Sequence, residues 1–286
     1  FTAEELADFA SKAYADEKFG GADTAPVVKL GEGKNLLELW HGPTCAFKDM
    51  ALQMLPHLLT ASLRKTGETR TACILVATSG DTGKAALDGF HDVPGTKIMV
   101  YYPVDGVSPM QKLQMVTQEA ANVEVIAIHG NFDDAQSAVK RIFTDDETRA
   151  QHDRDGMMLS SANSINWGRL APQIAYYVSA YCDMVAAGTI AQGDKINVCV
   201  PTGNFGNILA AYIAKKMGLP VNKFICASNR NNVLTDFFKK DGEYNRNRDF
   251  YTTTSPSMDI LISSNLERLL FFASDFDDRM VAELMA

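Results

Sequence analysis

Short apolar runs alternate along the chain with longer stretches in which apolar positions recur every three or four residues. The short runs predict strands, and the periodic stretches predict helices. This alternation is typical of βαβ units and parallel sheets, so the predicted fold class is α/β. The predicted strands are Cys73–Ala77, Ile98–Tyr102, Val123–Ile128, Ile196–Val200 and Phe224–Ala227, and the predicted helices are 82–91, 108–118, 132–143, 166–187 and 206–217.

Other segments carry weaker signals. Polar stretches at 144–156 and 239–250 predict exposed loops. Pro172 predicts that the long helix is regular only beyond that residue. The chain starts at Phe1 and ends within the helical pattern of 275–286, so the sequence is expected to be incomplete at both ends.

The composition is that of a globular protein. A chain of 286 residues, 46% hydrophobic and 22% charged, suffices for one large or two medium domains. The formal charge of −8, without a basic run, argues against general binding to nucleic acids or membrane surfaces. An anionic substrate would therefore require locally placed cations.

The cysteines and the N-terminus bear on location. The five cysteines lack CxxC spacing and are odd in number, which favours reduced thiols. They are Cys45, Cys73, Cys182, Cys199 and Cys226. No apolar run approaches ~18 residues, and the acidic N-terminus shows no signal-peptide pattern. The sequence predicts a cytoplasmic protein.

Lys48 lies where the polar loop HGPTCAFKDM gives way to the apolar run MALQML, so its amine can be held in place and partly removed from water. A free lysine has a pKa near ~10.4, and a neutral amine at pH 7 requires roughly 4 to 5 kcal/mol of environmental bias. Burial supplies such bias, and so does conversion to a Schiff base. The alternative is a solvated lysine at a helix start.

Two glycine-rich loops, ATSGDTGKAA at 77–86 and PTGNFGNILA at 201–210, each follow a predicted strand and open a predicted helix. This geometry presents backbone N–H groups to an anion. Ligands collect at the carboxyl ends of strands in open α/β sheets, so both loops belong on the same functional edge if their strands are parallel. A candidate reactive lysine with two anion-binding loops indicates a phosphorylated cofactor and an anionic substrate.

The second loop suits a phosphate. Gly203 and Gly206 let the backbone approach closely, while Asn204 and Asn207 can cap the helix or add donors. Pro201 replaces the first glycine of GxGxxG, so this is not a dinucleotide fingerprint. The alternative is a simple strand-to-helix turn.

The first loop suits a carboxylate, because Thr78, Ser79 and Thr82 add hydroxyls to N–H donors at a helix start. The alternative is helix capping by Ser79 and Asp81, and both uses can coexist. A Walker loop is excluded, because GxxxxGK requires glycine at Thr78 and a hydroxyl at Ala85.

The segment NSINWGR adds a second candidate anion site. Asn163, Ser164, Asn166 and Arg169 can line one side of a helix start, and Arg169 can hold a phosphate bidentately. The alternative is a capped helix with an exposed arginine. Lys84 and Lys112 are further candidate cations, with Lys112 more typical of surface charge. His41 fits a structural donor as well as an acid or base, and no metal-ligand pattern appears.

These motifs, with SSANSINWGRLAPQIAYY at 160–177 and SPSMDILISSNLERLLF at 255–271, resemble the shorter class of threonine synthases. That group belongs to the fold-type-II enzymes that use pyridoxal phosphate (PLP). The resemblance runs from about Pro26 to Leu270. It implies two open, mainly parallel-sheet α/β domains with PLP in the cleft between them. The smaller would cover about 50–160 and the larger 1–49 plus 161–286, incomplete at its C-terminus.

The resemblance also implies site roles. PLP would form a Schiff base on the catalytic Lys48. Asp81 would contact its ring, where relatives often carry asparagine, and an aspartate there is usual for threonine synthases. The residue facing the pyridine nitrogen would lie in the missing C-terminal part. The implied ligands of the PLP phosphate are Gly203, Asn204, Phe205, Gly206 and Asn207, and the implied substrate-binding residues are Thr78, Ser79, Thr82, Lys84, Asn163, Asn166 and Arg169.

The implied reaction converts O-phospho-L-homoserine and water into L-threonine and phosphate. Two alternatives remain, namely another PLP lyase such as a serine/threonine dehydratase, and a noncatalytic phosphate-ligand binding relative. The expected partner is this small-molecule substrate, with no nucleic acid or membrane, in a monomer or a homodimer.

Overall fold

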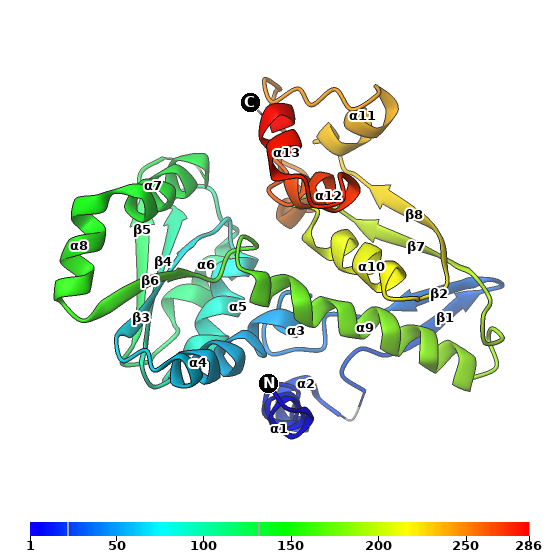
Figure 1. Cartoon of the computed structure of the whole chain (residues 1–286), viewed down its shortest axis with the longest axis horizontal. Helices are drawn as coiled ribbons and strands as arrows, with labels where there is room; N and C mark the ends of the chain where they lie inside the picture. Colours follow the sequence, from blue (N-terminus) through cyan, green and yellow to red (C-terminus); the bar gives the residue numbers. More distant parts are fainter. Residues whose placement is uncertain (22, 131, 286) are drawn as a thin grey trace. The chain divides into compact units, whose positions relative to one another are not determined.

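The computed structural model describes residues 1–21, 23–130 and 132–285, except for the side chain of Asp133. The chain forms two compact units, Phe1–Pro172 and Gln173–Ala286, and each is described by itself. Figure 1 shows their helices and strands in chain order. The sequence-based domain boundaries, near residues 50 and 160, stay a prediction.

The first unit contains a four-stranded sheet in which every neighbouring pair is parallel. Every residue of β3 after the first is buried, as expected for a parallel strand covered on both faces. The three predicted strands are confirmed, whereas β6 was not predicted because the short segment MMLSS ends in two polar residues. The strand order is β5-β4-β3-β6, with β3 at Thr71–Ala77, β4 at Thr96–Pro103, β5 at Val123–Ile128 and β6 at Met157–Ser161.

Helices cover both faces of this sheet. Ile74 and Val76 of β3 pack with Leu87 of α5 on one face, while Cys73 and Leu75 pack with Val139 of α7 on the other. Alternate residues of a strand point to opposite faces, so one apolar run supplies both cores. The helices predicted here are confirmed as α5 (Asp81–Phe90), α6 (Pro109–Val116) and α7 (Phe132–Thr144).

The predicted loop at 144–156 is wrong, because α8 occupies Asp146–Arg154. Asp145 caps this helix by accepting a hydrogen bond from the backbone N–H of Thr148 at 2.9 Å. The helix has no buried residue, so it carries no apolar stripe that periodicity could have revealed.

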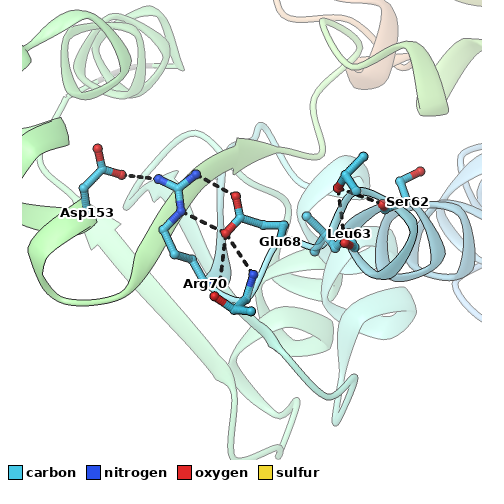
Figure 2. A network of polar contacts seen from close by, with 7 residues as sticks. Ser62, Leu63, Glu68, Arg70 and Asp153 are labelled. Atoms are coloured by element: carbon cyan, nitrogen blue, oxygen red, sulfur yellow. Dashed lines mark hydrogen bonds and ion pairs between the residues drawn. The ribbon is translucent and has the colours of Figure 1, made fainter.

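Arg70 joins α8 to the start of β3. Its guanidinium donates to both carboxylate oxygens of Glu68 and to Asp153 of α8, as Figure 2 shows. The bonds from Arg70 hold the pKa of Glu68 at about 2, well below its ordinary value. This network lies at the amino end of β3, whereas the glycine loop follows the carboxyl end.

The N-terminal part of the first unit contains a hairpin and four helices. Helix α1 begins with a capping box between Thr2 and Glu5, and its residues Phe9 and Ala13 pack against Ala61 of α4. These elements are α1 (Ala3–Ala13), α2 (Asp16–Phe19), the antiparallel strands β1 (Val27–Gly31) and β2 (Lys34–Leu37), α3 (Asp49–Leu52) and α4 (Leu55–Thr66).

Helix α9 (Trp167–Ala186) runs through the boundary between the units. It already begins five residues before Pro172, so the prediction of a helix regular only beyond that proline is wrong. Pro172 is the sixth residue of α9, past the first turn, so it removes the N–H bond that this position would make to the Gly168 carbonyl, and the helix continues without that bond. None of the helices in the described part of the chain is both long and apolar enough to span a membrane.

The second unit contains one βαβ unit, and its predicted strands and helix are confirmed. Strands β7 (Ile196–Pro201) and β8 (Val221–Ala227) are parallel and are joined by α10 (Gly206–Lys216). The predicted loop at 239–250 is confirmed from residue 240 onward. The remaining elements are α11 (Val233–Lys239), the 3-10 helix η1 (Pro256–Met258), α12 (Leu266–Ala273) and α13 (Asp278–Met285).

Candidate functional site

Lys48 lies directly before α3 and is only 8% exposed. Its Nζ donates to Oδ2 of Asp81 at 2.5 Å and lies 4.5 Å from the centre of the Phe47 ring. Asp81 opens α5 at the carboxyl end of β3, so a short helix and the central strand bring together residues far apart in the sequence. The amine is therefore held in place and largely removed from water, unlike that of a solvated surface lysine.

Asp49 fixes the loop that leads to Lys48. Its carboxylate is fully buried and accepts hydrogen bonds from the backbone N–H and the hydroxyl of Thr44, at 2.9 and 2.6 Å. A Cβ atom at Gly42 would lie 2.6 Å from the Asp49 side chain, so the loop has room only for glycine there. Burial raises the pKa of Asp49, and its bonds to Thr44 oppose that shift. The sequence analysis missed this role, because an aspartate at a helix start is common.

The first glycine loop, residues 78–83, bonds mainly to itself. The hydroxyl oxygen of Thr78 accepts from the backbone N–H groups of Gly80 and Gly83, at 2.9 and 2.8 Å. Oδ1 of Asp81 accepts from the N–H of Thr82 at 2.8 Å. The capping oxygens therefore belong to Thr78 and Asp81, so the reading that Ser79 shares the capping role is wrong.

The hydroxyl groups of Ser79 and Thr82 remain available in this loop. Within the described ranges, neither hydroxyl oxygen forms a hydrogen bond, and both side chains are only partly buried. Four of the loop's N–H groups are already used, since that of Thr78 donates to the Tyr101 carbonyl, so an anion here would be bound largely by hydroxyl groups. The two hydroxyls that the sequence analysis singled out therefore have no partner among the described residues, and their role in substrate binding stays a prediction.

Two of the other candidate polar side chains, those of Lys84 and His41, have partners. Lys84 donates to Gln118 and lies 3.8 Å from Asp88. Nε2 of His41 lies 2.7 Å from Glu38, which favours its structural reading. Lys112 is exposed, in agreement with surface charge.

The segment after β6 is held by its two asparagines. The Asn163 amide bonds to both the N–H and the carbonyl of Ala77 at the end of β3. The Asn166 amide donates to the carbonyl of Ser161 and accepts from the N–H of Gly168. Each amide nitrogen carries two N–H donors, and its bond to a backbone carbonyl uses one of them. The role of both asparagines as substrate ligands stays a prediction.

Arg169 is 4% exposed, so the alternative of an exposed arginine is wrong. Its Nη1 donates to the carbonyl of Ala162. Burial lowers the pKa of Arg169 to about 10, and the negative charge of Asp81 partly offsets that effect. Asp81 therefore interacts electrostatically with two buried cations, Lys48 and Arg169.

The second glycine loop, Gly203–Asn207, follows β7 in the second unit, in a different sheet from the first loop. The hydroxyl of Ser263 donates to the Gly203 carbonyl at 2.8 Å. The backbone N–H and the side-chain amide of Asn265 donate to the Asn204 carbonyl, at 3.1 and 3.0 Å. The backbone N–H groups of 203–207 donate to no residue that the structure describes.

The backbone of this second loop has the form of an anion-binding turn. Phe205 adopts a left-handed conformation with φ of 64° at the start of α10, which favours successive N–H groups converging on one point. A Cβ atom at Gly203 would lie 2.9 Å from Ile260 and 3.3 Å from the backbone of Met258, so the loop rests closely on the segment behind it.

Asn207 is held by two tyrosines of α9. Its amide oxygen accepts from the hydroxyls of Tyr176, at 2.9 Å, and of Tyr177. The amide nitrogen is left as the group that can donate to a ligand. The sequence predicts no role for Ser263, Asn265 or the two tyrosines, because no local pattern pairs these residues with the loop.

The chain was compared with known families and proteins. The family model described as pyridoxal-phosphate dependent enzyme matches residues 31–282. Human threonine synthase-like 1 is 47% identical over 99% of this chain and 38% of its own length. Threonine synthase from Pseudomonas aeruginosa is 42% identical over 100% of this chain and 58% of its own length.

A similar fold is found in solved structures. PLP-bound threonine synthase from Brucella melitensis matches with a TM-score of 0.86 at 42% identity, over 99% of this chain and 57% of that one. Threonine synthase from Escherichia coli matches with a TM-score of 0.76 at 32% identity, over 97% of this chain and 67% of that one. The chain thus spans only part of the length of these relatives.

Proposed function

The chain belongs to the family of pyridoxal-phosphate-dependent enzymes, and on that premise we propose that it converts O-phospho-L-homoserine and water into L-threonine and inorganic phosphate. The observation that carries the proposal is the buried pair of Lys48 and Asp81, at 2.5 Å, with Arg169 in the same charge cluster. The Lys48 amine, together with an arginine that can bind an anion, suits a substrate whose leaving group is a phosphate.

The residues present fit the cofactor that the family uses. Lys48 supplies the buried amine that an aldehyde requires, and we assign the ring contact to Asp81. The unused N–H groups of Gly203, Asn204, Phe205, Gly206 and Asn207 suit a phosphate monoester, and a Cβ at Gly203 would crowd the loop. When bound, the cofactor supplies the electron sink for carbanion chemistry at the substrate.

We assign the substrate's carboxylate to the first loop. Ser79 and Thr82 would donate their hydroxyls, while Thr78 would keep the loop in shape through its two bonds to backbone N–H groups. We assign the substrate's phosphate to Arg169, with Lys84, Asn163 and Asn166 as the further proposed contacts. Two separate anion sites would set the position of the carbon chain between them.

Lys48 would also move the protons. Its free amine would take protons from the α and β carbons and deliver protons to the γ carbon, which becomes the methyl group of threonine, and back to the α carbon. Asp81, which accepts a bond from this amine, would keep it oriented. The C–O bond at the γ carbon breaks as phosphate leaves, and a water molecule adds at the β carbon, so that the atoms balance.

A second candidate is another PLP lyase, such as a serine/threonine dehydratase. The observation in its favour is that the family model matching residues 31–282 describes pyridoxal-phosphate dependent enzymes in general. Such an enzyme has no use for a second anion site near Arg169, because neither serine nor threonine carries a phosphate.

The deciding experiment is a product assay on the full protein saturated with PLP. O-phospho-L-homoserine should yield threonine and phosphate in equal amounts, while serine and threonine are deaminated slowly or not at all. Lys48→Ala should abolish turnover, and Lys97→Ala, at an exposed position of β4, should not. Borohydride reduction and peptide mapping should label Lys48. Faster turnover of serine or threonine would establish the dehydratase, and a label on another lysine would refute the catalytic assignment.

A further inference from the structure

The second glycine loop is held from behind by a short segment that precedes α12. Ser263 is buried, and its hydroxyl donates to the carbonyl of Gly203 at 2.8 Å. Asn265 is 1% exposed and donates twice to the carbonyl of Asn204. Both residues therefore bind the loop through its acceptors and leave its donors unused.

Fixing these carbonyls also fixes the direction of the adjacent N–H groups. A trans peptide unit is planar, and its C=O and N–H bonds point in opposite directions. The Gly203 carbonyl shares its plane with the N–H of Asn204, and the Asn204 carbonyl shares its plane with the N–H of Phe205. Holding the two carbonyls toward 263–265 therefore turns both N–H groups to the opposite side.

Arg268 determines which end of the Asn265 amide faces the loop. Its Nη1 donates to Oδ1 of Asn265 at 2.6 Å. Arginine carries only donors, so the amide oxygen must point toward it and the amide nitrogen toward the Asn204 carbonyl. The donor-only guanidinium of Arg268 thus fixes the orientation of the Asn265 amide.

We propose that Ser263 and Asn265, the latter oriented by Arg268, are positioning residues that preset the N–H groups of Asn204 and Phe205 for a phosphate monoester. The inference rests on the proposed function in one respect, namely that Gly203–Asn207 receives the cofactor's phosphate. A donor set fixed before binding loses less conformational freedom when the anion arrives, which raises affinity. No contact between 263–265 and the ligand is required.

The test compares two ligands that differ only in the phosphate. The cofactor-stripped protein is titrated with PLP and with pyridoxal, and binding is followed by the absorbance of the Lys48 adduct. Ser263→Ala and Asn265→Leu should each weaken PLP binding about 10-fold, while pyridoxal binding changes less than about 2-fold. Ser263→Thr, which keeps the hydroxyl, should bind PLP nearly as the unmodified protein does.

Asn222→Leu is the matched control, because Asn222 is an exposed asparagine of the same unit whose amide bonds to Asn197. It should leave both affinities unchanged. Equal weakening of PLP and pyridoxal by Ser263→Ala and Asn265→Leu would overturn the inference, because it would indicate general disruption of the unit. Unchanged PLP affinity in both variants would overturn it as well.

Gly203→Ala separates this inference from the proposed function. If it weakens PLP binding selectively while the Ser263 and Asn265 variants do not, the loop binds the phosphate and only the positioning role fails. If Gly203→Ala leaves PLP affinity unchanged, the assignment of the phosphate to this loop fails first.

Discussion

The two glycine-rich loops follow parallel strands and open helices in the same way, yet they leave different groups available. In the loop at 78–83, the Thr78 hydroxyl accepts two backbone N–H bonds, and the hydroxyls of Ser79 and Thr82 are donors without a partner among the described residues. In Gly203–Asn207, Ser263 and Asn265 hold two carbonyls, and the free donors are backbone N–H groups. The threonine that directly follows each strand also forms different hydrogen bonds. Thr78 accepts bonds from two backbone N–H groups, whereas Thr202 donates its hydroxyl to the Val200 carbonyl.

The difference shows that a glycine-rich strand-to-helix turn is not by itself an anion site. Anion binding depends on which polar groups of the turn already form hydrogen bonds within the loop, and which form them with another segment of the chain. A loop that caps itself must bind through side chains, which can be adapted to one substrate. A loop held by its carbonyls binds through the backbone, which suits a phosphate group common to many ligands.

The largest expected effect comes from removing the free hydroxyls of the first loop. Ser79→Ala combined with Thr82→Val should lower kcat/KM for O-phospho-L-homoserine by at least about 100-fold, because hydrogen bonds to a charged group contribute roughly 1.5 to 3 kcal/mol each. PLP affinity should not change. Steady-state kinetics and a PLP titration measure the two quantities.

Ser62→Ala with Thr66→Val is the matched control, since both hydroxyls donate to carbonyls of α4, where Figure 2 labels Ser62. It should leave kcat/KM unchanged. A loss of PLP affinity in the Ser79/Thr82 variant, with kcat/KM otherwise preserved, would reverse the roles assigned to the two loops.

The second prediction concerns Arg169. Arg169→Met should lower kcat/KM about 30-fold to 100-fold, because the leaving phosphate loses charged hydrogen bonds. PLP should remain attached to Lys48. Arg154→Met, at an exposed position of α8, is the charge-matched control and should have no effect. If Arg169→Met instead changes the spectrum of the bound cofactor without affecting kcat/KM, Arg169 acts only through Asp81.

The third prediction tests the self-capping of the first loop. Thr78→Val should lower the free energy of unfolding by about 2 kcal/mol, because two buried N–H groups lose their acceptor. Thr78→Ser keeps the oxygen and should cost less than about 1 kcal/mol. Urea denaturation of the cofactor-stripped protein measures both, and an equal loss in the two variants would mean that the methyl group, not the hydroxyl, stabilises the loop.

The smallest effect is expected in the Arg70 network of Figure 2, at the amino end of β3. The pKa of Glu68 is depressed from 4.5 to about 2 in the folded protein. The contribution of the Glu68 carboxylate to the stability of the folded protein is therefore present above pH 4.5 and is lost as the pH falls toward 2. Glu68→Gln should lower Tm by at most about 2 °C at pH 6, and the difference from the unmodified protein should shrink at pH 3. A difference that grows on acidification would contradict the assigned pKa shift.

The predicted elements that the structure confirms are those that carry a clear hydrophobic period. The strand Cys73–Ala77 was recognisable because both of its faces are buried, and the helix at 206–217 because one of its faces is. The helix Asp146–Arg154 was missed for the opposite reason, since it buries nothing and depends on the cap at Asp145. Pro172 misled the prediction because a proline inside a helix removes one N–H bond, and the other bonds of this 20-residue helix maintain it on both sides of the proline.

The candidate site was predicted in part. Lys48 and the two glycine loops were visible as local motifs, but the residues that fix them were not. Asp49 and Thr44 form a bond within five positions that no pattern marks as special, whereas Ser263 and Gly203 lie sixty positions apart. The assignment of Lys48 and of residues in the two glycine loops as catalytic or binding residues stays a prediction.

The sequence by itself determined the α/β class, the family resemblance and the segments in which the chemistry lies, because hydrophobic periods and glycine-rich turns are properties of neighbouring residues. Only the tertiary structure decided which donors those segments keep. Whether an N–H group is free depends on an oxygen that folding brings near, and that oxygen belongs to Thr78 in one loop. In the other loop, folding instead brings the donors of Ser263 and Asn265 to the carbonyls.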